Sequence, residues 1–306
     1  MNILIRADSS STIGTGHIMR DLVLAKQYKK ETIIFATQNL SGNSNDKIQK
    51  AGYPIKILQS NSIQELNIVI KKLSINMLII DHYGIDYKYE KQLKKHNPKL
   101  KILSFDDTYE KHYCDILLNH NIYANSKNYK HLVPKKCELR CGSQYTLLRD
   151  EFIQEKKKRK QQLQSNSFVI NIFIAMGGAD TAQLNIPILK ILSKFNHIKV
   201  NLVTTSSNKN LHLLKNYCKK KPWISLHINS NKIAKFMRKS DFGIITPSVT
   251  ANELYFMKVP FLAIKTADNQ KEMYKFLKNT KYLIMDNFNA VRFKVKAKYL
   301  IKSFRG

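Results

Sequence analysis

The sequence has few cysteines, and of the four only Cys137 and Cys141 lie close together. A structural zinc site normally needs a second pair of cysteines, or histidines at ligand spacing, and the sequence has neither. We therefore expect no metal site and no cofactor, with the thiols buried or partly buried in a reducing compartment. The residue pattern does not decide whether a reaction depends on a divalent metal.

Long apolar runs are also absent. The apolar segments end after a handful of residues, as in NMLII and FVINIFIAM, whereas a membrane-spanning helix needs about 20 such residues. The N-terminal residues lack the basic-then-apolar order of a signal peptide. We therefore expect a cytoplasmic protein without a membrane span.

Acidic residues are scarce, since 22 Asp and Glu stand against 52 Lys and Arg, which gives a formal net charge of +30. Such a charge is typical of proteins that bind nucleic acid. Here, however, the lysines are spread along the chain, and the one dense run is EKKKRKQQ at residues 155–162. A solvated helix face or a linker explains that run more simply than a binding arm does. We therefore expect no nucleic-acid partner.

Short apolar segments alternate with segments of helical spacing in the first half of the chain. This alternation implies parallel strands that are joined by crossover helices. Plausible helix N-caps are Asp46, Ser62 and Asp86. The expected strands are 3–5, 32–35, 55–58, 77–80 and 101–105, and the expected helices are 17–29, 46–51, 62–73 and 86–96.

The same alternation restarts after the charged run, with expected strands at 168–175, 199–204, 225–228, 242–246 and 261–264. A chain of 306 residues is about twice a typical domain. We therefore expect two doubly wound, Rossmann-like α/β domains. Their expected ranges are 1–150 and 168–285, with a charged linker or helix at 151–167 and a tail at 286–306 that the sequence does not place.

The first candidate site is the loop DSSSTIGTGH, which follows the first expected strand. Ligands of open parallel sheets bind beyond the carboxyl ends of the strands, where this loop lies. Gly14 and Gly16 allow a tight turn and a close approach to a ligand, and His17 falls at the start of a helix. The third glycine of the GxGxxG fingerprint is replaced by Met19. On these residues alone, His17 is as well explained by helix capping as by catalysis.

The second candidate site is the loop AMGGADTAQLN at residues 175–185. Gly177 and Gly178 at a strand end, followed by Asp180 before a helix, can form a cradle of backbone amides for phosphate. The alternative is an ordinary turn from strand to helix.

The third candidate site is the segment TPSVTANELYFMKVP at residues 246–260. Ser248 and Thr250 can bind phosphate or cap the helix that follows. Glu253 lies in the first turn of that helix, where its carboxylate can accept both hydroxyls of a ribose or merely complement the helix dipole. Further candidates at expected strand ends are Asp81, His82, Tyr83, Asp106 and Asp107.

A series of segments connects these sites in a recognisable order. They are DSSSTIGTGHIMRDLVLAKQY, LIIDHYGI, KILSFDD, CDILLN, VPKKCELRCG, the segment around Arg149, AMGGAD and the helix with Asn252 and Glu253. In this order they resemble the UDP-2,4-diacetamido-2,4,6-trideoxy-β-L-altropyranose hydrolases of pseudaminic acid biosynthesis. The resemblance covers nearly all of residues 1–270 and does not extend to the tail.

This resemblance implies a GT-B-type fold with an interdomain cleft, similar to the glycosyltransferase that adds N-acetylglucosamine in peptidoglycan assembly. Water would replace the acceptor, attack the anomeric carbon and release UDP with inversion. The sugar product would pass to a pseudaminic acid synthase. The alternatives are a UDP-sugar-dependent glycosyltransferase and, last, a nucleic-acid-binding protein.

The resemblance also assigns roles to single residues. The catalytic base falls at His17, a suitable residue because histidine can accept a proton near neutral pH. An aspartate such as Asp8 can stabilise the charge that develops at the anomeric carbon, or orient His17. The UDP-sugar contacts fall at Arg149, Gly177 and Gly178 for the diphosphate, Thr246 and Pro247 for the uracil, Ser248 and Asn252 for phosphate or ribose, Glu253 for the ribose hydroxyls, and Tyr83 and Asn269 for the sugar.

Overall fold

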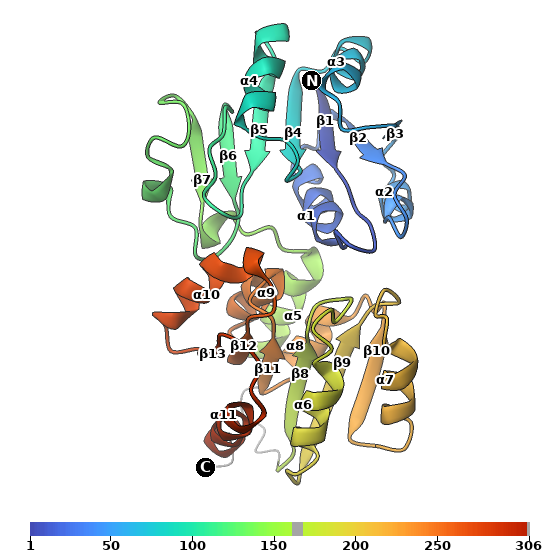
Figure 1. The fold of residues 1–306 in the computed structure, drawn as a ribbon, viewed down its shortest axis with the longest axis vertical. Helices are drawn as coiled ribbons and strands as arrows, with labels where there is room; N and C mark the ends of the chain where they lie inside the picture. Colours follow the sequence, from blue (N-terminus) through green and yellow to red (C-terminus); the bar gives the residue numbers. More distant parts are fainter. Residues whose placement is uncertain (161–167, 305–306) are drawn as a thin grey trace. The chain divides into compact units, whose positions relative to one another are not determined.

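The computed structural model describes residues 1–160 and 168–304, which belong to two compact units, Met1–Leu147 and Leu148–Gly306 (Figure 1). Helix α5 (Asp150–Lys160) opens the second unit and covers the first part of the expected linker. The rest of that linker, residues 161–167, lies outside the described residues. Each unit contains one open sheet with parallel strand pairs, as the alternating pattern predicts.

The sheet of the first unit has the strand order β3-β2-β1-β4-β5-β6-β7. Its strands are β1 (Asn2–Ala7), β2 (Thr32–Gln38), β3 (Ile55–Leu58), β4 (Met77–Asp81), β5 (Lys101–Phe105), β6 (Ile116–Asn119) and β7 (Glu138–Cys141). The connecting helices are α1 (Gly16–Ala25), α2 (Asn45–Lys50), α3 (Ile63–Lys72) and α4 (Tyr87–His96), with short 3₁₀ turns at Ser126–Tyr129 and Ser143–Tyr145.

Helices cover both faces of this sheet, which explains why its central strands are almost wholly apolar. Ile3 of β1 points to one face and packs with Ile18 of α1. Leu4, the next residue, points to the other face and packs with Leu66 of α3 and Leu93 of α4. The first unit is therefore doubly wound, as expected.

The sheet of the second unit has the strand order β10-β9-β8-β11-β12-β13. Its strands are β8 (Ile170–Ala175), β9 (Ile198–Thr204), β10 (Ile224–Ile228), β11 (Phe242–Ile245), β12 (Phe261–Ile264) and β13 (Leu283–Met285). After α5, its helices are α6 (Asn185–Leu192), α7 (Leu211–Cys218), α8 (Ile233–Arg238), α9 (Val249–Met257), the 3₁₀ turn Asp268–Gln270, α10 (Lys271–Lys278) and α11 (Ala290–Ser303).

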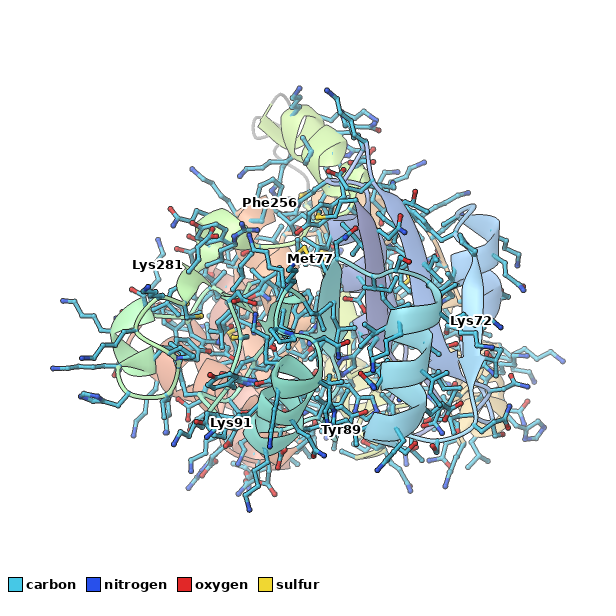
Figure 2. All side chains as sticks on the ribbon, turned by 90° about the horizontal axis from the view of Figure 1, so that it is seen from above. Lys72, Met77, Tyr89, Lys91, Phe256 and Lys281 are labelled. Atoms are coloured by element: carbon cyan, nitrogen blue, oxygen red, sulfur yellow. The ribbon has the colours of Figure 1, made fainter. Side chains whose placement is uncertain are left out.

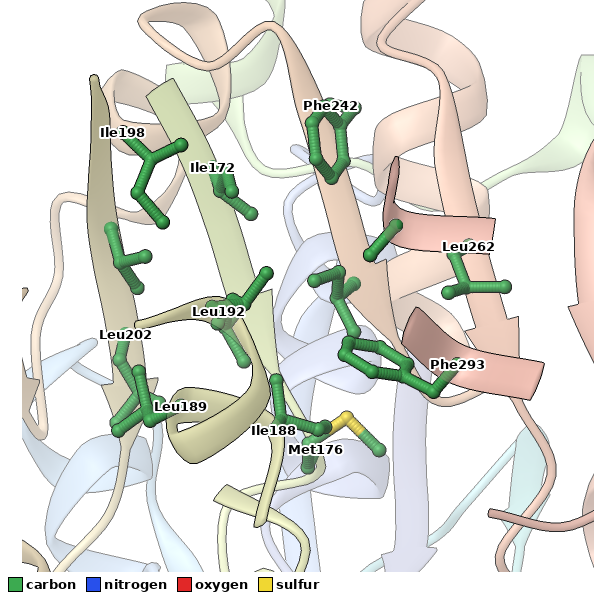
Figure 3. Close-up of a cluster of buried hydrophobic side chains, with 14 of the residues drawn as sticks. Ile172, Met176, Ile188, Leu189, Leu192, Ile198, Leu202, Phe242, Leu262 and Phe293 are labelled. Carbon is green, nitrogen blue, oxygen red and sulfur yellow. The ribbon is translucent and has the colours of Figure 1, made fainter. Parts of the chain in front are cut away.

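The tail that the sequence did not place contributes helix α11 to the core of the second unit. Phe293 of α11 is fully buried and packs with residues of the sheet and of α6, as Figure 3 shows. Ala297, Leu300 and Ile301 line the same face of the helix and are also buried. Residues 290–303 therefore belong to the folded unit.

Two of the three predicted helix caps are confirmed. The side chains of Ser62 and Asp86 accept hydrogen bonds from the backbone N–H groups of Glu65 and Tyr89, at 3.3 Å and 2.9 Å. The prediction for Asp46 is wrong, because Asp46 lies inside α2 and the N-cap position is Ser44.

Lysine side chains extend outward from the ribbon, as at the exposed Lys72 and Lys91, whereas Met77 is buried (Figure 2). Of the helices in the described part of the chain, none has both the length and the apolar content that a bilayer crossing requires.

Candidate active site

The carboxyl ends of β1, β4, β5 and β6 lie side by side in the first unit, and the polar candidates of the sequence meet there. Helix α1 starts from the loop after β1 and adds polar side chains of its own. The residues brought together are His17, Arg20 and Asp21 on α1, Asp81 at the end of β4, Tyr83, Asp107 and His120.

His17 is the second residue of α1 and is 9% exposed. Its Nδ1 lies 2.6 Å from Asp81 Oδ1, and its ring meets the Tyr83 ring edge-on at 5.0 Å between centroids. The N-cap position is Thr15, so the helix-capping explanation of His17 is wrong. The short contact with a carboxylate assigns the Nδ1 proton to His17 and leaves the lone pair on Nε2.

Arg20 holds Asp81 in place beside the imidazole, and its Nη2 lies 3.4 Å from His17 Nδ1. Its Nε donates to Asp81 Oδ2 at 2.6 Å and its Nη2 donates to Oδ1 at 2.5 Å, which is a bidentate pair. Burial alone would raise the pKa of Asp81, but the charges of Arg20 and His17 outweigh it and hold that pKa well below its usual range. Asp81 is therefore an anion that orients His17.

Arg20 also reaches the loop after β5. Its Nη1 donates to both carboxylate oxygens of Asp107, at 3.0 Å and 2.9 Å, and its guanidinium lies over the Phe105 ring. Asp107 accepts further hydrogen bonds from the Tyr83 hydroxyl at 3.0 Å and from Asn121 Nδ2 at 2.8 Å. Arg20 thus links the carboxyl ends of the neighbouring strands β4 and β5 next to His17.

Asp21, the next residue on α1, is fully buried. Neither of its carboxyl oxygens accepts a hydrogen bond from the described residues. Burial raises the pKa of Asp21 well above its usual range, and the neighbouring charge of Asp81 raises it further. Burial and the neighbouring Asp81 charge therefore both favour the protonated form of Asp21 by raising its pKa.

Asp8 has other partners than His17. It forms a buried ion pair with Arg6 at 2.6 Å and accepts hydrogen bonds from Gln38 N and from His82 Nε2. Asp81, and not Asp8, is the carboxylate that orients His17. A contact between Asp8 and a substrate stays a prediction.

In the second unit, the glycine loop follows β8 at the carboxyl edge of the sheet. Gly177 has a φ of +80°, a left-handed conformation that favours glycine. A Cβ atom at Gly178 would lie 2.9 Å from Thr205 Cγ2, so this position also has little room for a side chain. Asp180 is buried and accepts from Leu184 N and Asn185 N, which fixes the loop to the start of α6.

The neighbouring strand β11 ends at Ile245 and is followed by the buried Thr246 and Pro247, and α9 begins at Val249. Ser248 is the N-cap residue of α9, but its side chain makes no capping hydrogen bond. Asn252 is buried in the first turn of this helix. Asn269 is exposed in the turn after β12, the next strand along the same edge of the sheet.

Glu253 lies next to Asn252 and retains 14% of its side-chain exposure. Its Oε1 accepts a hydrogen bond from Arg149 Nη2 at 3.3 Å, while Arg149 Nη1 pairs with Glu151 at 2.7 Å. Burial raises the pKa of Glu253 to about 7, although Arg149 opposes the shift. Glu253 is therefore a carboxyl group that changes charge near neutral pH.

Within residues 1–160 and 168–304, no group of three or more His, Cys, Asp or Glu side chains is arranged to hold a metal ion. The acidic side chains beside His17 are instead committed to Arg20. What this arrangement can do chemically is accept a proton at His17 Nε2, with the resulting imidazolium stabilised by Asp81.

Sequence reasoning did not single out Arg20, Asp21 or His120. For the first two a signal was present, because positions three and four residues after His17 lie on the same side of a helix. His120 directly follows β6, where strand-end residues were to be expected, and burial lowers its pKa to about 4. Asp81 and Asp107 were candidates, but their link to Arg20 was not foreseen.

The solved structures that are similar to this chain include glycosyltransferases. MurG of Acinetobacter baumannii has a TM-score of 0.62 at 12% identity over 99% of this chain and 94% of that chain. Alr3699/HepE of Anabaena, in complex with UDP-glucose, has a TM-score of 0.62 at 10% identity over 99% of this chain and 90% of that chain. No family model matches the chain. Such low identities show the fold alone, which is the GT-B fold of two Rossmann-like domains.

A curated relative shows the family. The chain is 44% identical over 282 residues to the UDP-2,4-diacetamido-2,4,6-trideoxy-beta-L-altropyranose hydrolase of Campylobacter jejuni, covering 92% of this chain and 98% of that protein. The chain belongs to the family of this UDP-sugar hydrolase. The family expected from the sequence motifs is thereby confirmed.

Proposed function

We propose that the protein hydrolyses UDP-2,4-diacetamido-2,4,6-trideoxy-β-L-altropyranose to UDP and 2,4-diacetamido-2,4,6-trideoxy-L-altropyranose. The name of the Campylobacter jejuni relative, at 44% identity, supports this substrate. The observation that carries the proposal is the 2.6 Å contact between His17 Nδ1 and Asp81, which leaves Nε2 as a base.

In the proposed reaction, His17 Nε2 takes a proton from a water molecule as the water oxygen attacks the anomeric carbon. The bond between C1 and the β-phosphate oxygen breaks, the electron pair leaves with UDP, and the anomeric carbon inverts. Asp81 stabilises the imidazolium that forms, and Arg20 keeps Asp81 ionised and in position. Tyr83, whose ring borders His17, would contact the sugar together with Asn269, and Asp8 would stabilise the developing positive charge.

The second unit would bind UDP. Backbone amides of Gly177 and Gly178 and the positive end of the α9 dipole favour a diphosphate. The ionised Glu253 can accept both ribose hydroxyls, with Arg149 serving as its counter-ion and as a diphosphate contact. The other proposed contacts are Thr246 and Pro247 for the uracil, and Ser248 and Asn252 for phosphate or ribose.

The proposed place of the reaction is the biosynthesis of pseudaminic acid. The free sugar would be the substrate of a pseudaminic acid synthase, which would act as the downstream partner.

Hydrolysis in ¹⁸O-water, followed by NMR, tests the proposal. We expect the label on C1 of the released sugar, unlabelled UDP, and an initial product with the opposite anomeric configuration. Label in the β-phosphate of UDP would contradict the proposal, because it would mean that water attacks phosphorus.

A glycosyltransferase is the second candidate, and the fold of the similar solved structures favours it. The two functions differ when the protein is incubated with UDP-sugar in the absence of any acceptor other than water. A hydrolase releases free sugar at a multiple-turnover rate, whereas a transferase releases little.

A further inference from the structure

Helix α11 carries an exposed apolar line that the core of the second unit does not use. Val291, Val295 and Tyr299 are 74%, 64% and 64% exposed and follow one another at intervals of four residues. At this spacing they lie along one side of the helix. Single exposed apolar residues are common on proteins, but a line of them suggests a docking surface. These three residues are called the α11 stripe below.

The opposite face of α11 holds the helix in place. Phe293 and Ala297 are fully buried in the core of the second unit, and Leu300 and Ile301 are nearly fully buried there. The α11 stripe is therefore presented outward by a helix that is anchored in the folded unit, and docking requires no rearrangement.

Basic side chains surround the α11 stripe. Helix α11 contains five basic residues and no acidic residue. Of these, Arg292, Lys294, Lys298 and Lys302 are exposed. An apolar line between cations is complementary to a surface that offers apolar groups beneath a layer of negative charge.

We propose that the α11 stripe docks the protein on an anionic lipid surface. Val291, Val295 and the ring of Tyr299 would enter the boundary between head groups and acyl chains. The lysine and arginine side chains would extend to the lipid phosphates while their aliphatic parts stay on the apolar layer. In this geometry the helix lies on the membrane and does not span it. The proposal is independent of the proposed function.

Nucleic acid fits these observations less well. Phosphate contacts use the charges alone, and they would leave the α11 stripe in water. A second copy of the chain fits less well too, because the cations of two such helices would face each other.

Binding of the full chain to vesicles tests the proposal. Vesicles of phosphatidylcholine with phosphatidylglycerol should retain the protein, and vesicles of phosphatidylcholine alone should not. The triple variant Val291→Gln, Val295→Gln, Tyr299→Gln keeps every charge and should bind at least about tenfold more weakly. Replacement of Lys294, Lys298 and Lys302 by Gln should weaken binding about fivefold for each lysine.

The matched control is Leu213→Gln, which replaces an apolar residue of α7 that is 57% exposed. This variant should bind anionic vesicles like the original chain. The proposal is overturned if the α11 stripe variant, with an unchanged melting temperature, binds as well as the control.

Two further measurements test whether nucleic acid or a second copy of the chain, and not lipid, binds the α11 stripe. If the lysine variant loses affinity for duplex DNA while neither variant changes vesicle binding, the surface binds nucleic acid and the lipid proposal fails. If sedimentation shows a dimer that only the α11 stripe variant disrupts, and vesicles are not bound, a second copy occupies the surface and the proposal also fails.

Discussion

At the scale of single residues, the contact between His17 and Asp81 supports the proposal that His17 is the base. We expect His17→Ala to lower kcat by about 10²- to 10⁴-fold, since it removes the proposed base. UDP affinity should stay unchanged, because the proposed nucleotide contacts lie in the other unit. Calorimetry with UDP and a turnover assay measure the two effects separately. Near-original hydrolysis by this variant would exclude His17 as the base.

Asp81→Asn tests the positioning of His17. An amide in place of the carboxylate cannot stabilise the imidazolium, and it can turn a donor towards Nδ1. We expect a large loss of kcat with little change in KM, and a shift in the pH profile of kcat. A variant that loses stability while the pH profile of its residual activity keeps its shape would indicate a merely structural role.

From the raised pKa of Glu253, we expect the affinity for UDP to depend on pH. Its carboxyl group has a pKa of about 7 in the free protein, and only the ionised form can accept both ribose hydroxyls. Affinity for UDP should therefore fall as the pH is lowered through about 7, approaching tenfold per pH unit below it. Glu253→Gln should bind more weakly and lack this dependence. An equal slope in both proteins would assign the titration to another group.

From the raised pKa of Asp21, we expect the free energy of unfolding of the first unit to depend on pH. Its pKa is raised in the folded state, so the group favours folding most below its unfolded pKa and loses this contribution as the pH rises. Asp21→Asn cannot ionise, and its amide can still donate to Asp81. The variant should therefore gain urea resistance relative to the original chain at pH 8 and gain less at pH 5. Parallel curves at both pH values would show that Asp21 is not protonated in the folded protein.

At the scale of elements, residues 290–303 form helix α11, whose buried face packs in the core of the second unit. Phe293→Ala should lower the free energy of unfolding by about 3–5 kcal/mol, because it leaves a cavity where a fully buried ring was. Val291→Ala, on the exposed side of the same helix, should change it by less than about 0.5 kcal/mol. Equal effects in chemical denaturation would mean that α11 is not docked through Phe293.

Some of these helices and strands were predictable from the sequence, and others were not. Strands such as β4 were predictable because helices cover both faces of the sheet, which requires continuous apolar runs. β7 was missed because its residues Glu138–Cys141 are only partly buried and mix charged with apolar types. α11 was missed because apolar residues occur on both its buried and its exposed side, which hides the helical periodicity.

The active-site partners illustrate a different limit. His17 was identifiable from its place after the first strand and from the family resemblance. Its partner Asp81 lies 64 positions further along the chain, and the two meet only because β1 and β4 are neighbours in the sheet. Strand order is a tertiary property, so local spacing did not distinguish Asp81 from Asp8.

At the scale of the whole molecule, two compact units, each with its own buried hydrophobic clusters, predict two unfolding transitions. If the second unit holds UDP, the nucleotide should raise the temperature of one transition by mass action and leave the other in place. Differential scanning calorimetry with and without UDP measures this directly. A shift of both transitions by the same amount would show that UDP stabilises the two units together.

The excess of lysine over acidic residues also has a different meaning once the fold is known. Several of the few acidic residues are placed inside, where Asp8, Asp81 and Asp107 pair with buried arginines. Lysines such as Lys72 and Lys91 are exposed. The net charge therefore belongs to the solvent-facing side chains, and added salt should screen its effect on association with anionic surfaces.

The buried group around Arg20 has a charge balance that matters for the reaction. Arg20 supplies one positive charge, Asp81 and Asp107 supply one negative charge each, and His120, with a pKa of about 4, is neutral at pH 7. Burial raises the pKa of Asp21, which favours its neutral form. With Asp21 protonated and a neutral imidazole at His17, the group holds one uncompensated negative charge. If His17 is the base, as proposed, the proton that it takes from water would cancel that charge, and the buried group around Arg20 would become neutral only as the nucleophile forms.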